Sequence, residues 1–135
     1  MDRSTATTTT ETDRRSVVES YLESFSKRDL EGCMSRFTDD AVIHYGPATL
    51  GLGQFRGKEA IEKWHRDRFT AGAEIVKIEN IQSNAKEVRV SGVFTSPRLK
   101  AVRLDDFRGS GTFLFEGERF KVVKLGLRSG YRFHI

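Results

Sequence analysis

The spacing of the hydrophobic residues changes once along the chain, near residue 73, from a helical period to strict alternation. Before this point apolar side chains recur every three to four residues, which predicts helices beginning near Asp13, Asp29 and Lys58. After it they recur every second residue, which predicts four long strands in hairpin order. The alternating residues are Val76 and Ile78, Val88 and Val90, Phe113 and Phe115, and Val123, Leu125 and Leu127. Helices followed by antiparallel strands are typical of an α+β fold with the helices on one face of a bent sheet.

The segments between the expected helices are short. Ala41–Tyr45 is β-branched and aromatic and predicts a strand, whereas residues 38–40 predict a polar break. Residues 46–56 are rich in glycine and predict a loop. This loop reads G-x-G-x-x-x-G, one residue longer than the dinucleotide-binding motif, and it follows no βαβ unit. It therefore does not predict a nucleotide site.

The length of 135 residues and an apolar content of 37% fit one domain. We expect residues 1–12, which are rich in threonine, to form a disordered tail before a domain at 13–135. The chain has no apolar run long enough to span a membrane and no apolar secretion segment near Met1, so we expect a soluble, cytoplasmic protein. One cysteine and three scattered histidines predict neither a disulfide nor a bound metal, and no cofactor motif is present.

The net charge of +4 comes from the C-terminal part of the chain. Residues 97–135 hold 9 Lys and Arg against 4 Asp and Glu. These basic residues alternate with apolar ones, which indicates the solvent-facing side of strands. No aromatic RNA-binding motif and no helix-turn-helix pattern accompanies them, so we expect no nucleic-acid partner.

Three stretches carry a family resemblance: residues 17–32 (VVESYLESFSKRDLEG), residues 36–45 (RFTDDAVIHY) and residues 55–64 (FRGKEAIEKW). Together with the closing strand pair around Glu116-Gly117, they resemble the SnoaL-like branch of the nuclear transport factor 2 superfamily, which includes ketosteroid isomerases and polyketide cyclases. The resemblance implies a cone-shaped, cystatin-like fold, with three N-terminal helices packed on a strongly curved, mainly antiparallel sheet. It also implies an apolar cavity that binds a small apolar ligand or substrate.

The catalytic residues of ketosteroid isomerase carry over only in part. Its first-helix tyrosine matches Tyr21, its general-base aspartate falls on Tyr45, and its protonated acid falls near Gly111. Steroid isomerisation is therefore not predicted. Tyr21 and Tyr45 remain candidate catalytic phenols that donate hydrogen bonds to a carbonyl or enolate oxygen. The alternative is that each hydroxyl bonds a backbone group inside the core.

Asp105 and Asp106 interrupt an otherwise apolar and basic strand, and the apolar alternation changes across them. This change predicts a β-bulge between Asp105 and Gly111, which would turn one carboxylate toward the cavity as a general base. SnoaL-like cyclases are thought to use such an aspartate. The alternative is that both are rim carboxylates paired with Arg103 or Arg108.

The remaining expectations concern the cavity wall and the outer face of the sheet. The substrate-binding candidates, which should converge with Tyr21 on one interior, are Phe25, Phe37, Trp64, Phe113 and Leu125. His65 is expected on the solvated flank of its helix. Val88, Val90 and Val122 are expected on the outer face, where they would support a homodimer through the sheets.

Two functions from different classes stay open. The first is a cofactor-independent enzyme of the isomerase, cyclase or lyase type that acts on an apolar carbonyl-bearing substrate by acid/base chemistry. The second is a non-catalytic ligand-binding or dimerisation module of the same fold. A cavity that holds an ionisable side chain close to a phenol would favour the enzyme.

Overall fold

The computed structural model describes residues 3–45, 53–70, 75–95 and 106–127, and within them the side chains of residues 14–45, 53–70, 76–93, 95 and 108–126. The described elements run helix, helix, strand, strand, helix and then four strands. They are α1 (Arg3–Ser26), α2 (Leu30–Met34), β1 (Phe37–Tyr45), β2 (Gln54–Arg56), α3 (Lys58–Thr70), β3 (Ile75–Ser83), β4 (Glu87–Thr95), β5 (Asp106–Glu116) and β6 (Arg119–Leu127). The expected α+β class is confirmed.

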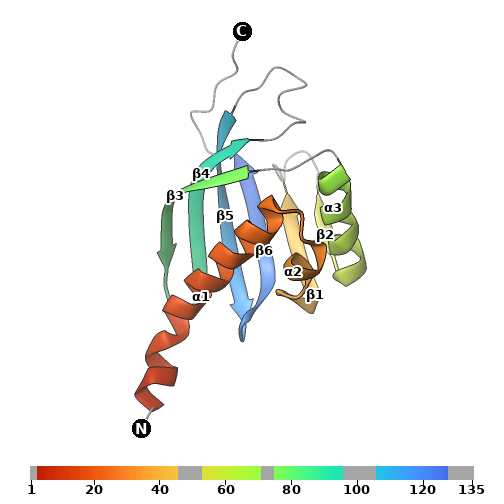
Figure 1. Cartoon of the computed structure of the whole chain (residues 1–135). Coiled ribbons are helices and arrows are strands. Elements are labelled where there is room, and N and C mark those ends of the chain that lie inside the picture. Colours follow the sequence, from red (N-terminus) through yellow and green to blue (C-terminus); the bar gives the residue numbers. More distant parts are fainter. Residues whose placement is uncertain (1–2, 46–52, 71–74, 96–105, 128–135) are drawn as a thin grey trace.

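All six strands form one sheet in the order β2-β1-β6-β5-β4-β3. Every neighbouring pair is antiparallel except β1 and β6, which run parallel. Figure 1 shows α1 crossing one face of the sheet, with α2 and α3 beside β1 and β2. In keeping with this view, α1 contacts β3 and β4, whereas α3 contacts β1 and β2. The helices therefore cover the face on which the core lies.

The core is unusually rich in aromatic rings. Phe37, Phe113 and Phe120 are fully buried, and all three pack around the ring of Tyr21 with centroid distances of 5.2–6.0 Å. The expected convergence is confirmed, because Tyr21 and all five substrate-binding candidates belong to this cluster or pack against it. Burial of each Phe removes enough apolar surface to stabilise the fold by about 1.5–3 kcal/mol.

The turn between α1 and α2 follows the sequence prediction. Asp29 is the N-cap of α2, and its carboxylate accepts a hydrogen bond from the Gly32 N–H at 3.0 Å. Arg28, just before it, has a positive φ of 57°, which reverses the chain between the two helices.

Two predicted breaks are strands in the structure. Residues 38–40 belong to β1, because pairing of the β1 backbone with β6 begins at Phe37 opposite Phe120, while the polar side chains stay outside. The exposed Asp40 carboxylate accepts a hydrogen bond from Lys121 Nζ at 2.6 Å. Within the expected loop at 46–56, residues 54–56 form β2 by pairing with β1, and residues 46–52 lie outside the described part.

The first helix starts earlier than the sequence indicates. α1 begins at Arg3, inside the stretch that the threonine-rich composition assigns to a disordered tail. Its backbone continues the helical hydrogen bonds of residues 13–26 toward the N-terminus. The domain boundary at residue 13 stays a prediction.

The predicted bulge between Asp105 and Gly111 is wrong where the strand is described. From Asp106 to Leu114, β5 pairs with β4 without interruption. The register of β5 shifts instead against β6, between Leu114 and Phe115, because β6 holds one extra residue there. Asp105 lies outside the described residues.

Val88 and Val90 face the core rather than the outer surface. They are 0% and 6% exposed, and they pair across the sheet with Phe113 and Gly111. Since Phe113 points to the helices, its partner on β4 must do so too. The alternate β4 residues, Arg89 among them, therefore face outward, and the outer face is more polar than expected.

Candidate functional site

Two polar side chains of α3 enter the aromatic core. Among the described residues, His65 and Arg68 are the buried polar or charged side chains, at 0% and 5% exposure. They lie three residues apart and so share one face of the helix. Each meets a tyrosine from another element, Tyr21 of α1 for His65 and Tyr45 of β1 for Arg68.

The Tyr21–His65 pair has a fixed hydrogen-bond direction. His65 Nδ1 lies 2.8 Å from the carbonyl oxygen of Ile61, which can only accept, so Nδ1 carries the hydrogen. In the neutral ring Nε2 is then an acceptor, and the Tyr21 hydroxyl donates to it at 2.7 Å. The hydroxyl hydrogen of Tyr21 is therefore committed to His65, a partner that neither sequence alternative included.

The surroundings of His65 keep it neutral. Its ring packs against Trp64 at a centroid distance of 4.8 Å, and against Phe25, Phe37 and Phe69 at 5.7–6.0 Å. Burial lowers the pKa of His65 to about 4, and the positive charge of Arg68 acts in the same direction. The ring is thus an uncharged hydrogen-bonding group near neutral pH.

In the Tyr45–Arg68 pair the tyrosine hydroxyl accepts the hydrogen bond, whereas in the Tyr21–His65 pair it donates. An Arg68 amino group donates to the Tyr45 hydroxyl oxygen at 3.1 Å. The guanidinium also lies over the rings of Tyr45 and Trp64, 4.6 and 4.5 Å from their centroids. An arginine cannot accept a hydrogen bond, so this contact leaves the Tyr45 hydroxyl hydrogen for another acceptor. Tyr45 is half-buried at the edge of the core, next to Trp64.

The structure brings together part of the predicted site. Tyr45 lies on the core side of β1 as the alternation predicts, and both candidate tyrosines are in contact with α3. Of the two candidate aspartates, Asp105 lies outside the described residues. For Asp106 only the backbone is described, opposite Thr95.

The prediction that His65 lies on the solvated flank of its helix is wrong, and Arg68 was not among the predicted site residues. The signal was present, because the buried residues of α3 follow one helical stripe at i, i+3, i+4 and i+7. They are Ile61, Trp64, His65 and Arg68. The spacing alone would have assigned His65 and Arg68 to the core, but their polar side chains favoured a prediction of surface positions.

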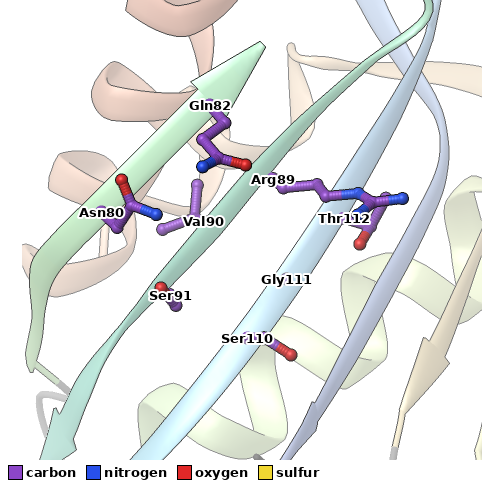
Figure 2. Close-up of a pocket in the computed structure, with 8 residues that line it drawn as sticks. All are labelled: Asn80, Gln82, Arg89, Val90, Ser91, Ser110, Gly111 and Thr112. Atoms are coloured by element: carbon purple, nitrogen blue, oxygen red, sulfur yellow. The ribbon is translucent and has the colours of Figure 1, made fainter. Parts of the chain in front are cut away.

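A depression of about 300 Å³ lies on the outer face of the sheet, away from the two tyrosine pairs, and Figure 2 shows it across β3, β4 and β5 with the helices behind the strands. Amide, hydroxyl and guanidinium groups dominate its lining, which consists of Asn80, Gln82, Arg89, Val90, Ser91, Ser110, Gly111 and Thr112. Arg89 Nε forms an ion pair at 2.5 Å with Glu87. This surface is open and polar, unlike the aromatic interior.

Two further findings apply to the described part of the chain. No group of three or more His, Cys, Asp or Glu side chains there could hold a metal ion. None of its helices has the length and apolar character needed to cross a membrane.

Helices on one face of a single mixed sheet, around a mostly aromatic interior with few buried polar groups, define an α+β class of protein. Within that class the chain belongs to the SnoaL-like domain family, whose model matches residues 18–123. The cone-shaped, cystatin-like architecture is thereby confirmed.

Solved structures support the same fold at low sequence identity. Bal32a, from a soil-derived mobile gene cassette, superposes with a TM-score of 0.77 and 16% identity, covering 88% of this chain and 92% of its own. An LEH-like epoxide hydrolase of M. tuberculosis gives 0.70 and 18%, covering 87% and 84%. TerC, co-crystallised with polyporic acid, gives 0.70 and 13%, covering 87% and 92%. A comparison with curated protein sequences found no match.

Proposed function

We propose that the chain is a cofactor-independent enzyme that moves a proton next to the carbonyl group of a small apolar substrate. The SnoaL-like fold family includes isomerases, cyclases and epoxide hydrolases, so acid/base chemistry on small molecules is within its range. The observation that carries the proposal is the hydrogen-bond direction at Tyr45. Because Arg68 donates to its oxygen, the Tyr45 phenol can donate its own hydrogen to a substrate oxygen.

Tyr45 supports this role better than Tyr21. The Tyr21 hydroxyl is buried among five rings and donates to His65 at 2.7 Å. Tyr45 is half-buried at the edge of the same cluster, where an apolar molecule could reach its hydroxyl. We assign Tyr45 as the oxyanion donor and Tyr21 as the group that holds α1 against α3.

In the proposed reaction the carboxylate of Asp105 takes a proton from the carbon next to the substrate carbonyl. Position 106 is less suitable for the base, because without a bulge it shares the register of Ser110 and Thr112, which line the outer face of β5. The electron pair of the broken C–H bond moves toward the carbonyl oxygen, which becomes an enolate and accepts the hydrogen bond of Tyr45. Return of the proton to another carbon completes an isomerisation. Attack of the enolate carbon on a second carbonyl would instead complete a cyclisation, with the proton passing to the new alkoxide.

Exchange of α-protons tests the proposal without knowledge of the natural substrate. 1-Tetralone, an apolar aromatic ketone, is incubated with the protein in D₂O and deuterium uptake at its α-carbon is followed by NMR. The wild type should accelerate exchange, and removing the base by Asp105→Asn should slow it roughly 10²–10⁴-fold, whereas Asp106→Asn should change it little. Tyr45→Phe should also slow the exchange. Tyr21→Phe, the matched control, should lower the stability of the fold but change the exchange rate less than Tyr45→Phe does.

The alternative, a non-catalytic binding module, predicts a different result. The ketone would bind with unchanged affinity in the aspartate variants, and the protein would not accelerate exchange above the buffer rate. That result would contradict the enzyme and leave the binding module as the better account.

We also propose a homodimer through the outer face of the sheet, now with a corrected set of residues. Leu114 and Val122 pair with each other on this face, and Val122 in turn pairs with Val42, which forms a small apolar row across three strands. Sedimentation of the wild type should give twice the 15.3 kDa monomer mass, and Leu114→Arg should restore the monomer. A wild type that sediments only as a monomer would contradict this assembly.

A further inference from the structure

We infer that Arg68 makes the site selective for acidic oxygens, so that its preferred ligands are enols and phenols bound with oxyanion character. Arg68 acts here as a positioning residue, through the Tyr45 hydroxyl. This inference rests on the proposed function, because it assigns the charge of the ligand oxygen that Tyr45 meets.

The geometry fixes how Arg68 acts on Tyr45. Its side chain is 95% buried and rises from α3 between two aromatic faces, with the guanidinium 4.6 Å from the Tyr45 centroid and 4.5 Å from the Trp64 centroid. The ring contacts limit the freedom of the guanidinium, while its amino group donates to the Tyr45 oxygen at 3.1 Å. Arg68 thereby occupies an acceptor position of the Tyr45 oxygen, and the Tyr45 hydroxyl hydrogen is left for the oxygen of a ligand.

The positive charge adds a second effect. A hydrogen bond from a cation polarises the phenol, so the Tyr45 hydroxyl hydrogen becomes a stronger donor. An oxygen bound to that hydrogen lies one hydroxyl group away from the guanidinium, which is itself held over the rings of Tyr45 and Trp64. Coulomb attraction at such a distance favours the ionised form of a ligand oxygen by roughly one to three powers of ten in its acid equilibrium. A neutral ketone gains much less from the same charge.

A series of 4-substituted phenols tests the inference. Phenol, 4-chlorophenol, 4-cyanophenol and 4-nitrophenol rise in acidity at similar size, and their methyl ethers measure the apolar contribution alone. Binding to the wild type is measured by calorimetry, and each phenol is compared with its own ether. We expect the phenol-to-ether ratio to increase along the series, by about tenfold or more from the weakest to the strongest acid.

The variants separate charge from packing. Arg68→Met keeps an unbranched side chain against the rings but removes the charge, and it should reduce the rise to less than about threefold. Arg68→Lys should keep part of the rise, because it keeps the charge without the planar fork. Arg66→Met is the matched control, because Arg66 is exposed on the same helix and pairs with Glu62. It should leave the rise unchanged.

The outcomes distinguish this inference from the proposed function. A wild type whose phenol-to-ether ratio does not change along the series overturns the inference whatever the variants do, as does a rise that Arg68→Met leaves intact. If Tyr45→Phe abolishes the preference for phenols over their ethers and also slows ketone exchange, the proposed function is supported independently. Exchange that persists with a flat phenol series would retain the enzyme and refute the selectivity.

Discussion

Mild acid should lower the free energy of unfolding of this protein, because it favours protonation of His65. The unfolded chain leaves the imidazole near its ordinary pKa of 6.5, whereas burial in the folded core lowers the pKa to about 4. A group with a lowered pKa in the folded state binds fewer protons there than in the unfolded state, so acid favours unfolding. At 1.36 kcal/mol for each pKa unit, the fold should lose roughly 3 kcal/mol as the pH falls from above 6.5 to about 4.

The loss has a structural origin that a variant can isolate. Protonated His65 would bear a hydrogen on Nε2, directed at the hydroxyl hydrogen of Tyr21 that now donates to it. Urea unfolding is measured for the wild type and His65→Gln at several pH values, and the difference in unfolding free energy is plotted against pH. This difference should fall by about 3 kcal/mol toward pH 4. A flat difference curve for His65→Gln would refute the assignment of a buried neutral imidazole.

Three further outcomes are expected. Gly92→Ala should destabilise the fold by about 1–3 kcal/mol in urea titrations, because its new Cβ would collide with the backbone carbonyl of Lys77, whereas Gly126→Ala, with open space around its Cβ, should cost much less. Cys33 should resist iodoacetamide until the protein is unfolded, since burial raises the pKa of its thiol to about 12, and rapid alkylation of the native protein would contradict this. Asp29→Ala should lower the unfolding free energy by about 0.5–2 kcal/mol through loss of the α2 cap, and an unchanged melting curve would be the contrary result.

The elements with strong hydrophobic periods could be predicted from the sequence because local pattern and burial agree there. The four long strands and α3 were predicted in this way, although Val88 and Val90 face the core and not the outer side. Asp29 was predicted as a cap from its residue type. Residues 38–40 and β2 were not predicted as strands, because their strand character comes from pairing with other segments of the chain. Backbone pairing of Phe37 with Phe120 is invisible in the composition of residues 38–40.

The site was predicted in part for a different reason. Tyr21 and Tyr45 could be placed inside because aromatic residues at those positions fit either the core or a cavity. His65 and Arg68 could not, since a polar residue type favours the surface unless its partners are known. Those partners, the Ile61 carbonyl and the Tyr21 and Tyr45 hydroxyls, are brought together only by the packing of α3 against α1 and β1.

The parallel contact between β1 and β6 has a consequence for how the chain is made. β6 lies between β1 and β5, so it joins the half of the sheet built from the N-terminal segments to the half built from the hairpins. Until β6 emerges from the ribosome, β1 and β2 have no strand that connects them to β3, β4 and β5. The aromatic core therefore stays open to water through most of synthesis, and closure depends on a contact between distant segments, which is a slow kind of folding step.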